Sequence, residues 1–362
     1  MYIYKKGTVT FQMKRFASLL LALFLVIPLT SCGNGGEKYL DQVIYGMDTY
    51  ITLRVADKTH DGGRVSDAYF DEICEKSAYI IAKNEKLMSA HNEDAQIYGL
   101  NNGVNMILSP DDSLLSVLRA ADNISEKTGG AFSYTLGGLS KLWNVKEGGP
   151  VPSDEDIAEA LLHISKGSVE FSEDKITKSD KECLIDLGGV AKGYTAQEIV
   201  EYLSTTNIPY GLVSMGGNIG VFGSKEDGTP FKVGVTDPSD TSKVVGYLKI
   251  GSGFISVSGS YERFFEENGV RYHHIIDPET GRPADSGILS VAVWTNNGSV
   301  SDALSTALFV MGVEGATEFY KSGQIDFEAV IITEDREIVL TDGIADGNFE
   351  LSSENYTVRK MN

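Results

Sequence analysis

Hydrophobic and polar positions follow two kinds of spacing along this chain. They alternate from Val43 to Val55, which predicts a first strand with a bend in its middle. Apolar residues at helical spacing predict amphipathic helices from Arg64 to Met88 and from Asp112 to Thr128, the second ending at Gly129-Gly130. Ser153, followed by three acidic residues, predicts the N-cap and first turn of a third helix.

Short β-like runs follow, and from Tyr210 onward they dominate the sequence. Helical spacing returns from Ser301 to Met311 and ends at Gly312. Strands and helices alternate without a strict period, and no repeat of 20–50 residues is present, so we expect an α+β fold with mixed sheets and packed helices. The predicted strands are Val169–Phe171, Lys175–Thr177, Cys183–Asp186, Leu212–Met215, Phe231–Val235, Val244–Ile250, Phe254–Ser258, Tyr272–Ile276 and Leu289–Trp294.

The amino terminus has the pattern of a secretory signal. Lys14 and Arg15 precede an apolar run from Phe16 to Leu29, and Leu29-Thr30-Ser31-Cys32 follows as a lipobox. The run is short for a bilayer span, which needs about 20 apolar residues. We therefore predict that residues 1–31 are removed, with translation starting at Met1 or at Met13.

Cys32 would become the first residue of the mature protein. An uncleaved anchor helix is the alternative, but a cysteine after Leu-Thr-Ser and before Gly33-Asn34-Gly35-Gly36 favours lipid attachment. A diacylated cysteine binds membranes more firmly than one acyl chain does. We expect an exported protein, lipid-anchored at the extracytoplasmic face of the membrane, with a tether at 32–40 and one domain at 41–362.

Composition narrows the classes of partner. The 362 residues are 42% hydrophobic and 23% charged, with a formal net charge of −20. Residues 1–31 contain four basic residues and no acidic ones, so their removal takes the charge to −24. Nucleic acid is excluded as a partner, because phosphate binding needs a basic face. Cys74 and Cys183 show no metal-binding spacing, and they could pair after export or remain two separate thiols.

Two glycine-rich junctions are candidates for binding an anion. Asp186-Leu-Gly-Gly-Val-Ala-Lys192 leaves a predicted strand and enters a predicted helix, an arrangement that exposes backbone N–H groups. Gly216-Gly217-Asn218 follows another strand and allows close approach of a ligand or of backbone. Either junction could also be only a tight turn.

Three later segments add side chains that could act on a phosphate. Ser256–Arg263 brings hydroxyls and an arginine suited to phosphate, and His274 precedes Asp277 by three residues, close enough to share a site. Asp302 and Thr306 are four apart, so on a helix they share one face and could hold one hard cation. Turns and a helix cap are the alternative interpretations.

Taken in order, these segments resemble the signature blocks of the ApbE family of flavin transferases. The first part of the chain adds to the resemblance through Met47-x-Thr49, Gly129-Gly-Ala131-Phe132 and Leu142-Trp143. The resemblance implies an ApbE-like, T-fold-related architecture. It also implies an FAD:protein FMN transferase, which uses magnesium to split FAD, releases AMP and esterifies FMN onto a Ser or Thr hydroxyl of another protein.

The resemblance also implies roles for individual residues. The magnesium ligands would be the backbone carbonyl of Gly189 with Asp302 and Thr306. His274 would be the catalytic base or orient the hydroxyl, supported by Asp277 and Arg263. The residues lining the FAD site would be Met47, Ala131, Phe132, Ser133, Asp186 and Lys192.

The chain departs from the family pattern at Ser133, where Asp is usual, at Ser260, where Asp or Asn is common, and at Ala95-Gln96, where a Ser-Glu pair is usual. None of these positions carries the magnesium or histidine roles, so activity is expected to be retained. The expected partners are FAD and acceptor proteins with a Ser/Thr flavinylation motif, membrane or exported redox proteins among them. An FAD pyrophosphatase and a flavin-binding lipoprotein without turnover are the alternatives.

Overall fold

A computed structural model describes residues 38–103, 111–164, 166–172 and 175–361. Its centre is a nine-stranded sheet in the order β1-β2-β5-β6-β9-β12-β13-β14-β16, in which only the β14–β16 pair is parallel. A three-stranded sheet (β15-β8-β7) and two small hairpins (β3–β4, β10–β11) complete the strands. This is the α+β architecture with mixed sheets that the sequence predicts, while the relation to T-fold proteins stays a prediction.

The helices, including two 3₁₀ turns, are α1 (Asp67–Met88), α2 (Gln96–Asn102), α3 (Asp112–Lys127), α4 (Gly137–Trp143), η1 (Val145–Glu147), α5 (Asp154–Leu161), η2 (Lys166–Ser168), α6 (Ala191–Ser204), α7 (Gly298–Ser322) and α8 (Asp342–Ala345). The strands are β1 (Tyr39–Gly46), β2 (Thr49–Ala56), β3 (Val169–Phe171), β4 (Ile176–Lys178), β5 (Tyr210–Met215), β6 (Asn218–Gly223), β7 (Phe231–Asp237), β8 (Asp240–Ile250), β9 (Gly253–Gly259), β10 (Phe264–Glu267), β11 (Val270–His273), β12 (Ile288–Thr295), β13 (Glu328–Thr333), β14 (Glu337–Leu340), β15 (Phe349–Leu351) and β16 (Thr357–Lys360).

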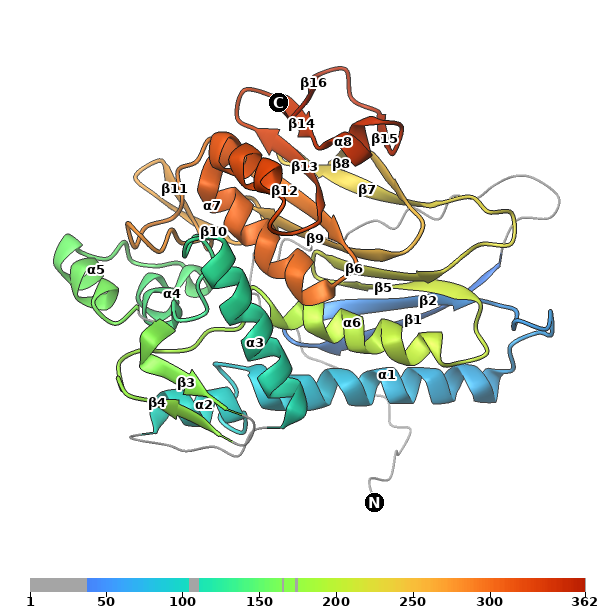
Figure 1. Ribbon diagram of the computed structural model, residues 1–362, viewed down its shortest axis with the longest axis horizontal. Helices are drawn as coiled ribbons and strands as arrows, with labels where there is room; N and C mark the ends of the chain where they lie inside the picture. Colours follow the sequence, from blue (N-terminus) through green and yellow to red (C-terminus); the bar gives the residue numbers. More distant parts are fainter. Residues whose placement is uncertain (1–37, 104–110, 165, 173–174, 362) are drawn as a thin grey trace, which may run out of the picture.

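The central sheet buries both of its faces at β12. Along β12, Val291 and Val293 belong to the hydrophobic cluster that contains α3 and α7, whereas Ala292 belongs to the cluster that contains β7 and β8. Successive side chains of a strand point to opposite faces, so at β12 the helices α3 and α7 pack on one side and the small sheet on the other. Figure 1 shows α1, α6 and α7 running along the large sheet. The site described below lies on this helical side.

The first predicted strand is wrong in one respect, because it is a hairpin. β1 and β2 are antiparallel and pair from Tyr39–Ala56 to Gly46–Thr49, leaving Met47 and Asp48 as a two-residue turn. Both turn residues have positive φ (49° and 61°), the backbone that reverses a chain between two twisted strands. The alternating pattern runs through the turn without a glycine, so the sequence resembles one bent strand.

The predicted helices are confirmed, with exact starts set by capping side chains. Ser66 accepts a hydrogen bond from the N–H of Tyr69 at the start of α1, and Ser153 accepts one from Asp156 at the start of α5. Gly312 has φ 71° and ψ 176°, so helical geometry breaks there, as predicted, before a second helical segment continues α7.

The predicted strand at Cys183–Asp186 is wrong, since this segment joins no ladder. Its backbone is satisfied elsewhere: the side chain of Asn101 bonds both the N–H and the carbonyl of Ile185, and the N–H of Asp186 donates to the carbonyl of Tyr134 at 2.8 Å. A buried extended segment can therefore be held by side-chain amides and loop carbonyls instead of a neighbouring strand.

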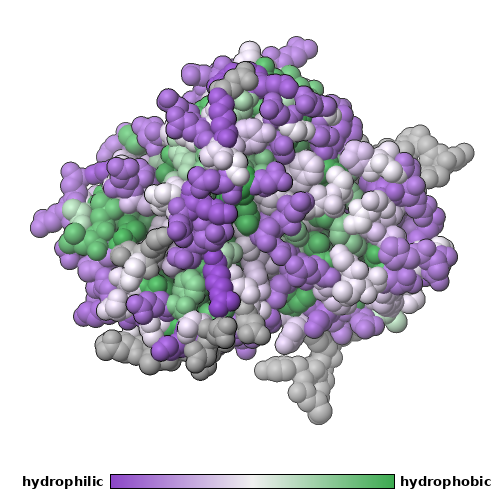
Figure 2. All heavy atoms as spheres, in the orientation of Figure 1, coloured by the Kyte–Doolittle hydropathy of each residue, from purple (hydrophilic) through white to green (hydrophobic). Residues whose placement is uncertain are grey.

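Cys74 and Cys183 are not joined by a disulfide in the part of the chain that the structure describes, which decides between the two alternatives left open above. Cys74 packs against the cluster around α1, whereas Cys183 is buried in the cluster around α3. In the part of the chain described, no helix is both long enough and apolar enough to cross a membrane. The face in Figure 2 is largely hydrophilic with scattered hydrophobic patches, one of them where Figure 1 places α5, next to the exposed Leu162.

Candidate functional site

The site is built where the first turns of α6 and α7 cross. A Cβ placed on Gly193 would lie 2.0 Å from the carbonyl oxygen of Gly298, and one on Gly298 would lie 2.2 Å from that of Gly193. Only glycine fits at such a contact, because a side chain would force the backbones apart. At this crossing the N–H of Gly193 donates to Asp302 Oδ2 at 2.8 Å. The glycines thus bring a buried carboxylate of α7 onto the start of α6.

The three predicted magnesium ligands come together at this crossing. A Cβ on Gly189 would lie 3.7 Å from Thr306 Oγ1 and 3.1 Å from the ring of Phe132. Asp302 is one helical turn before Thr306 on the same helix, as the spacing of four residues predicts. The site therefore offers a carboxylate, a hydroxyl and a backbone segment with a carbonyl, all of which are oxygen donors.

Hydroxyl groups of β9 hold α7 against the sheet through hydrogen bonds. Ser258 Oγ lies 2.8 Å from Ser305 Oγ and 3.1 Å from Thr306 Oγ1. Ser256 Oγ makes the equivalent contact with Ser301, one turn earlier on the helix. These hydroxyls are buried between strand and helix, so each one needs a partner. The serines predicted from Ser256–Arg263 to face a phosphate therefore hold the helix that carries Asp302 and Thr306.

Asp186, the first residue of the loop before α6, fixes the conformation of that loop. Asp186 Oδ1 accepts from the N–H of Gly188 at 2.8 Å, and Lys192 Nζ donates to the carbonyl of Gly188 at 3.2 Å. Asp186 and Lys192, both predicted at the FAD site, therefore stand on either side of the glycine pair. The N–H groups of Gly188, Val190 and Ala191 are already bonded within the loop, so Lys192 is the group of this segment that offers positive charge to an anion.

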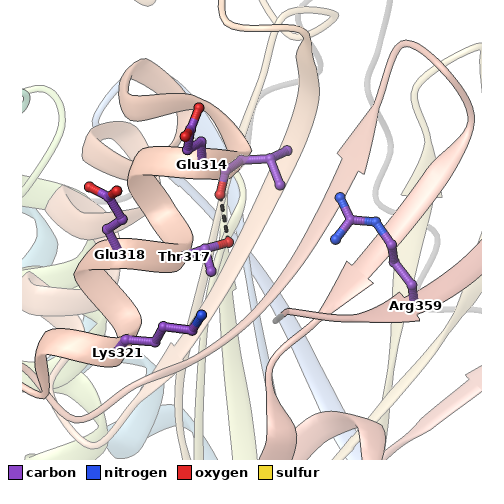
Figure 3. A pocket seen from close by; sticks show the side chains of 6 residues that line it. Glu314, Thr317, Glu318, Lys321 and Arg359 are labelled. Atoms are coloured by element: carbon purple, nitrogen blue, oxygen red, sulfur yellow. Dashed lines mark hydrogen bonds between the residues drawn. The ribbon is translucent and has the colours of Figure 1, made fainter.

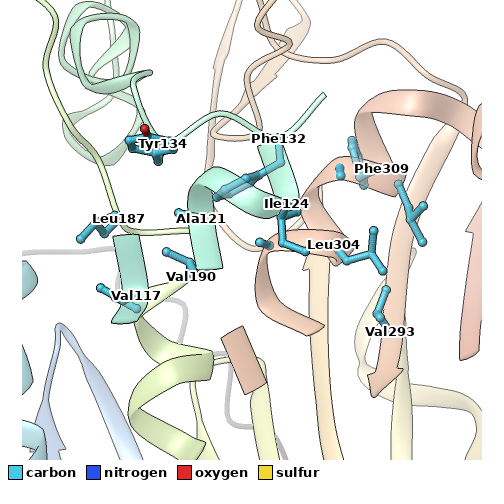
Figure 4. Close-up of a cluster of buried hydrophobic side chains, with 14 of the residues drawn as sticks. Val117, Ala121, Ile124, Phe132, Tyr134, Leu187, Val190, Val293, Leu304 and Phe309 are labelled. Carbon is cyan, nitrogen blue, oxygen red and sulfur yellow. The ribbon is translucent and has the colours of Figure 1, made fainter. Parts of the chain in front are cut away.

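The predicted block at Ala131, Phe132 and Ser133 lies against this loop. Phe132 is 3% exposed and lies between α3 and α7 with Leu187 and Val190 nearby, as Figure 4 shows. Ser133 Oγ is 3.0 Å from Thr135 Oγ1 and accepts from the N–H of Thr135, so it is used within its own turn. The departure at Ser133 therefore leaves a stable turn at this position.

The β1–β2 turn closes another side of the site. Met47, a predicted FAD contact, donates its N–H to Glu85 Oε2 at 3.2 Å. Asp48 Oδ2 lies 2.6 Å from Lys146 Nζ and 3.8 Å from Arg263. Partial burial alone would raise the pKa of Asp48, but the Lys146 hydrogen bond and the charges of Lys146 and Arg263 lower it. The turn is thereby attached to the predicted phosphate-binding arginine.

Arg263 and His274 meet at the base of the β10–β11 hairpin. The carbonyl of Arg263 accepts from the N–H of His274 at 3.1 Å and lies 3.3 Å from His274 Nδ1. A carbonyl can only accept, so Nδ1 carries the proton and Nε2 keeps its lone pair. The surrounding protein and the charges of Arg263 and Lys192 lower the pKa of His274. Because His274 is exposed, water reduces the size of this shift, but its direction keeps the imidazole ring neutral at pH 7.

The neighbouring titratable residues of this segment have structural contacts. His273 is buried, with Nε2 donating to the carbonyl of Ala284 and Nδ1 accepting from Ile275. Asp277 uses Oδ1 to accept from the N–H of Glu279 and Oδ2 to accept from the hydroxyl of Thr280. These bonds hold the turn in place, so the supporting catalytic role of Asp277 stays a prediction. His274 is the titratable group of this segment that could accept a proton.

Glu262 is the residue of this site to which the sequence assigns no role. Part of the residue reaches solvent, but its Oε1 is buried and has no hydrogen-bond partner among the residues described. A Cβ on Gly217 would lie 3.3 Å from this oxygen, so the carboxylate rests on the second glycine turn. Burial raises the pKa of Glu262 to about 7, against the opposing charges of Lys192 and Arg263. The one feature of the sequence that could have indicated a role for Glu262 is its position directly before Arg263.

Two further observations concern metal-binding clusters and surface depressions. Among the described residues there is no group of three or more His, Cys, Asp or Glu side chains arranged to hold a metal, so a cation here would rely on the mixed donors above. A surface depression of about 430 Å³ is lined by Glu314, Thr317, Lys321 and Arg359, among others, and Figure 3 shows it beside the second half of α7. None of the predicted site residues lines it.

Comparison with known proteins identifies the relatives of this chain. The model of the ApbE family matches residues 47–331. The FAD:protein FMN transferase of Treponema pallidum is 33% identical over 285 residues, covering 74% of this chain and 78% of that protein. The FAD:protein FMN transferase of Vibrio cholerae is 32% identical over 255 residues, covering 68% of this chain and 76% of that protein.

Solved structures show the same fold. An ApbE protein from Thermotoga maritima matches with a TM-score of 0.73 and 30% identity, covering 87% of this chain and 97% of that one. The flavin transferase ApbE from Vibrio cholerae matches with a TM-score of 0.73, 24% identity and coverage of 89% and 99%. By its sequence and by its fold, this chain belongs to the ApbE family.

Proposed function

We propose that this protein is an FAD:protein FMN transferase, which moves the FMN part of FAD to a Ser or Thr hydroxyl of an acceptor protein and releases AMP. The observation that carries the proposal is the convergence of the α6 loop, Asp302 with Thr306, and a neutral His274 beside Arg263. Relatives of this chain carry the same activity in their names. Lys192 and Arg263 supply the positive charge that a pyrophosphate requires.

The donor set at the helix crossing fits a magnesium ion. Mg²⁺ prefers oxygen ligands and is commonly bound by one or two carboxylates together with substrate phosphates. Asp302 keeps one carboxylate oxygen beyond the Oδ2 that Gly193 occupies, and Thr306 and the Gly189 carbonyl would complete the protein's share. A bound Mg²⁺ would neutralise charge that develops on the pyrophosphate oxygens.

The protein's own groups account for the proton and for orientation. The acceptor oxygen bonds to the FMN phosphorus while the bond from that phosphorus to the AMP oxygen breaks, and AMP leaves as the phosphate anion. His274 Nε2 takes the hydroxyl proton, since Nδ1–H is directed at the Arg263 carbonyl. Arg263 and Lys192 hold the phosphates, while the β1–β2 turn, fixed through Asp48, positions Arg263.

The direct test is to incubate the mature protein with FAD, magnesium and an acceptor domain that carries a Ser/Thr flavinylation motif. We expect the acceptor to gain the mass of FMN and to release one AMP per FMN attached. Free FMN at equal rates with and without acceptor would instead identify an FAD pyrophosphatase. Tight FAD retention without AMP would identify a flavin-binding lipoprotein.

Export and lipidation belong to the same proposal, although Cys32 and the signal at 1–31 lie outside the described residues. The supporting observation is the lipobox sequence Leu29-Thr30-Ser31-Cys32. A lipid-anchored enzyme at the extracytoplasmic face would serve membrane or exported redox proteins as acceptors. Intact mass of the membrane-extracted protein tests this: a diacylated chain beginning at Cys32 is expected, and a chain that keeps residues 13–31 would contradict it.

A further inference from the structure

We propose that the outer face of the β1–β2 hairpin, formed by Val43, Tyr45 and Tyr50, is the surface on which the acceptor protein docks. The inference rests on the proposed function, because it names where the second substrate of that reaction binds. It concerns the polypeptide acceptor, while the FAD site itself is built from other residues. The occupant is an extended segment of the acceptor that leads to its Ser or Thr.

The first observation is an exposed apolar face at the tip of the hairpin. Tyr45, Tyr50 and Val43 are 66%, 61% and 56% exposed. Tyr45 and Tyr50 pair directly across the two strands, with ring centroids 5.4 Å apart in an edge-to-face arrangement. Neighbouring positions Ile51 and Leu53 point to the opposite side and are buried. Rigid, exposed aromatic side chains of this kind are typical anchors of protein interfaces.

The second observation is that this face continues into the site. One residue separates Tyr45 and Tyr50 from the Met47-Asp48 turn on either side. Asp48 contacts Lys146 and Arg263, and the carbonyl of Arg263 holds His274. A chain that lies along the hairpin and passes its tip therefore reaches the proposed base within a few residues.

The third observation is the free edge of β1. In the part of the chain that the structure describes, β1 pairs with β2 alone and forms one end of the nine-stranded sheet. Figure 1 shows this hairpin at the border of the sheet. Uncovered edge strands usually carry charges or proline against unwanted pairing, and Asp41 is such a charge, but the half of β1 next to the turn presents Val43 and Tyr45. An edge of this kind accepts an extended peptide as an additional strand.

Charge favours a polypeptide over a lipid surface as the occupant. The mature chain carries a formal charge of −24 once the signal is removed, and anionic lipid headgroups would repel it. Near the hairpin tip, Lys146 and Arg263 are both paired with Asp48, so this part of the surface offers little unpaired positive charge to an anionic bilayer and suits the hydroxyl-bearing segment of an acceptor. Membrane contact by the tyrosines is retained as an outcome of the test.

The test compares the mature wild-type protein with the double variant Tyr45→Thr/Tyr50→Thr, using an acceptor domain that the wild type flavinylates. Threonine keeps β-propensity while it removes the rings. We expect the acceptor KM to rise by about tenfold or more, the scale of losing one interface anchor, with the affinity for FAD and the melting temperature unchanged. Val358→Thr, an exposed apolar residue on the opposite edge strand β16, is the control and should change nothing.

The outcomes separate this inference from the proposed function. If the wild type modifies no acceptor, the proposed function fails and takes the docking surface with it. If the wild type is active and the double variant keeps its KM for a soluble acceptor, only the docking surface is refuted. Loss of binding to vesicles of mixed neutral and anionic lipid, together with an unchanged soluble KM, would also refute it and assign the tyrosines to the membrane.

Discussion

The N–H of Gly193 donates to Asp302 Oδ2 at 2.8 Å, and this bond joins the first turn of α6 to the first turns of α7. It is formed across the closest helix contact of the site, where a side chain at Gly193 would collide with Gly298. The carboxylate is buried, so its position is set by this N–H and not by solvent. The bond holds Asp302, which we propose as a magnesium ligand, in a fixed position against Gly193, 109 residues away in the sequence.

We predict that Asp302→Asn removes turnover while the protein stays folded. The amide oxygen can still accept from Gly193, but the only charged group in the proposed magnesium site is gone. A fall in AMP release of about 100-fold or more is expected, the scale on which a lost electrostatic partner acts. AMP release by chromatography and melting temperature by calorimetry check this.

Asp302→Ala is the companion variant, and it should lose both activity and some stability. It leaves the buried N–H of Gly193 without a partner, at a cost of about 1–3 kcal/mol. Unchanged AMP release in the asparagine variant would remove Asp302 from the metal site, whatever the alanine variant does.

Gly193→Ala is expected to destabilise the protein and to weaken the site. Its Cβ would lie 2.0 Å from the Gly298 carbonyl oxygen and 2.7 Å from Asp302 Cβ, so the helices must separate. We expect a loss of about 1–3 kcal/mol or more, typical of forced overpacking, measured by denaturant unfolding. Gly251→Ala is the control, because no atom lies within 4 Å of a Cβ there and its φ is not positive. Equal stability of the two variants would contradict the proposed crossing.

The sequence predicts those parts of this architecture that depend on local signals. Ser153 caps α5 through its own hydroxyl, and Gly312 breaks α7 because of its backbone conformation, so both boundaries are readable from a few residues. Asp302 and Thr306 share a face by helical periodicity alone. The residue types at these positions are enough to predict their local geometry.

Other features depend on contacts between distant segments, and the sequence does not show them. Met47 and Asp48 adopt positive φ without a glycine, so the hairpin is hidden inside a continuous alternating pattern. Cys183–Asp186 is buried like a strand, but its partners are Asn101 and Tyr134. The buried oxygen of Glu262 rests on a turn about 45 residues earlier, and nothing in the local sequence shows that burial.

The pH dependence of the reaction is expected to report His274. A base must be neutral to accept a proton, so kcat/KM should fall as pH drops through the pKa of this ring in the free enzyme. The ordinary histidine pKa is about 6.5, and the surrounding protein, then the charges of Arg263 and Lys192, lower the pKa of His274, so the acidic limb should lie below pH 6.5.

Arg263→Gln should move that limb upward, because it removes one of the charges that disfavour the protonated ring. Its overall rate will also fall, but the position of the limb is independent of that. Arg271→Gln, on the same hairpin and paired with Glu266, is the control and should leave the limb in place. A limb that does not move with Arg263 would contradict His274 as the base.

Glu262 should make the metal-free protein lose stability as pH rises. Its folded pKa is about 7, above the ordinary glutamate value of 4.5, so the folded state holds a proton that the unfolded chain releases near pH 4.5. For an acid with a raised pKa, the stabilising contribution is fully present below the unfolded pKa and is lost as pH rises through the folded one.

Glu262→Gln removes this dependence, because the amide cannot ionise. With a chelator present, the variant should match the wild type near pH 4.5 and exceed it by about 1–3 kcal/mol at pH 8, measured by urea unfolding. Glu267→Gln, at the exposed end of β10, is the control and should follow the wild type at every pH. If the wild type and Glu262→Gln differ by the same amount at pH 4.5 and pH 8, Glu262 is not the group that carries this proton. The charges of Lys192 and Arg263 act on the Glu262 carboxylate, whose Oε1 has no partner among the described residues. If a group of FAD donates a hydrogen bond to that oxygen, adding FAD should reduce the stability difference between wild type and Glu262→Gln at pH 8.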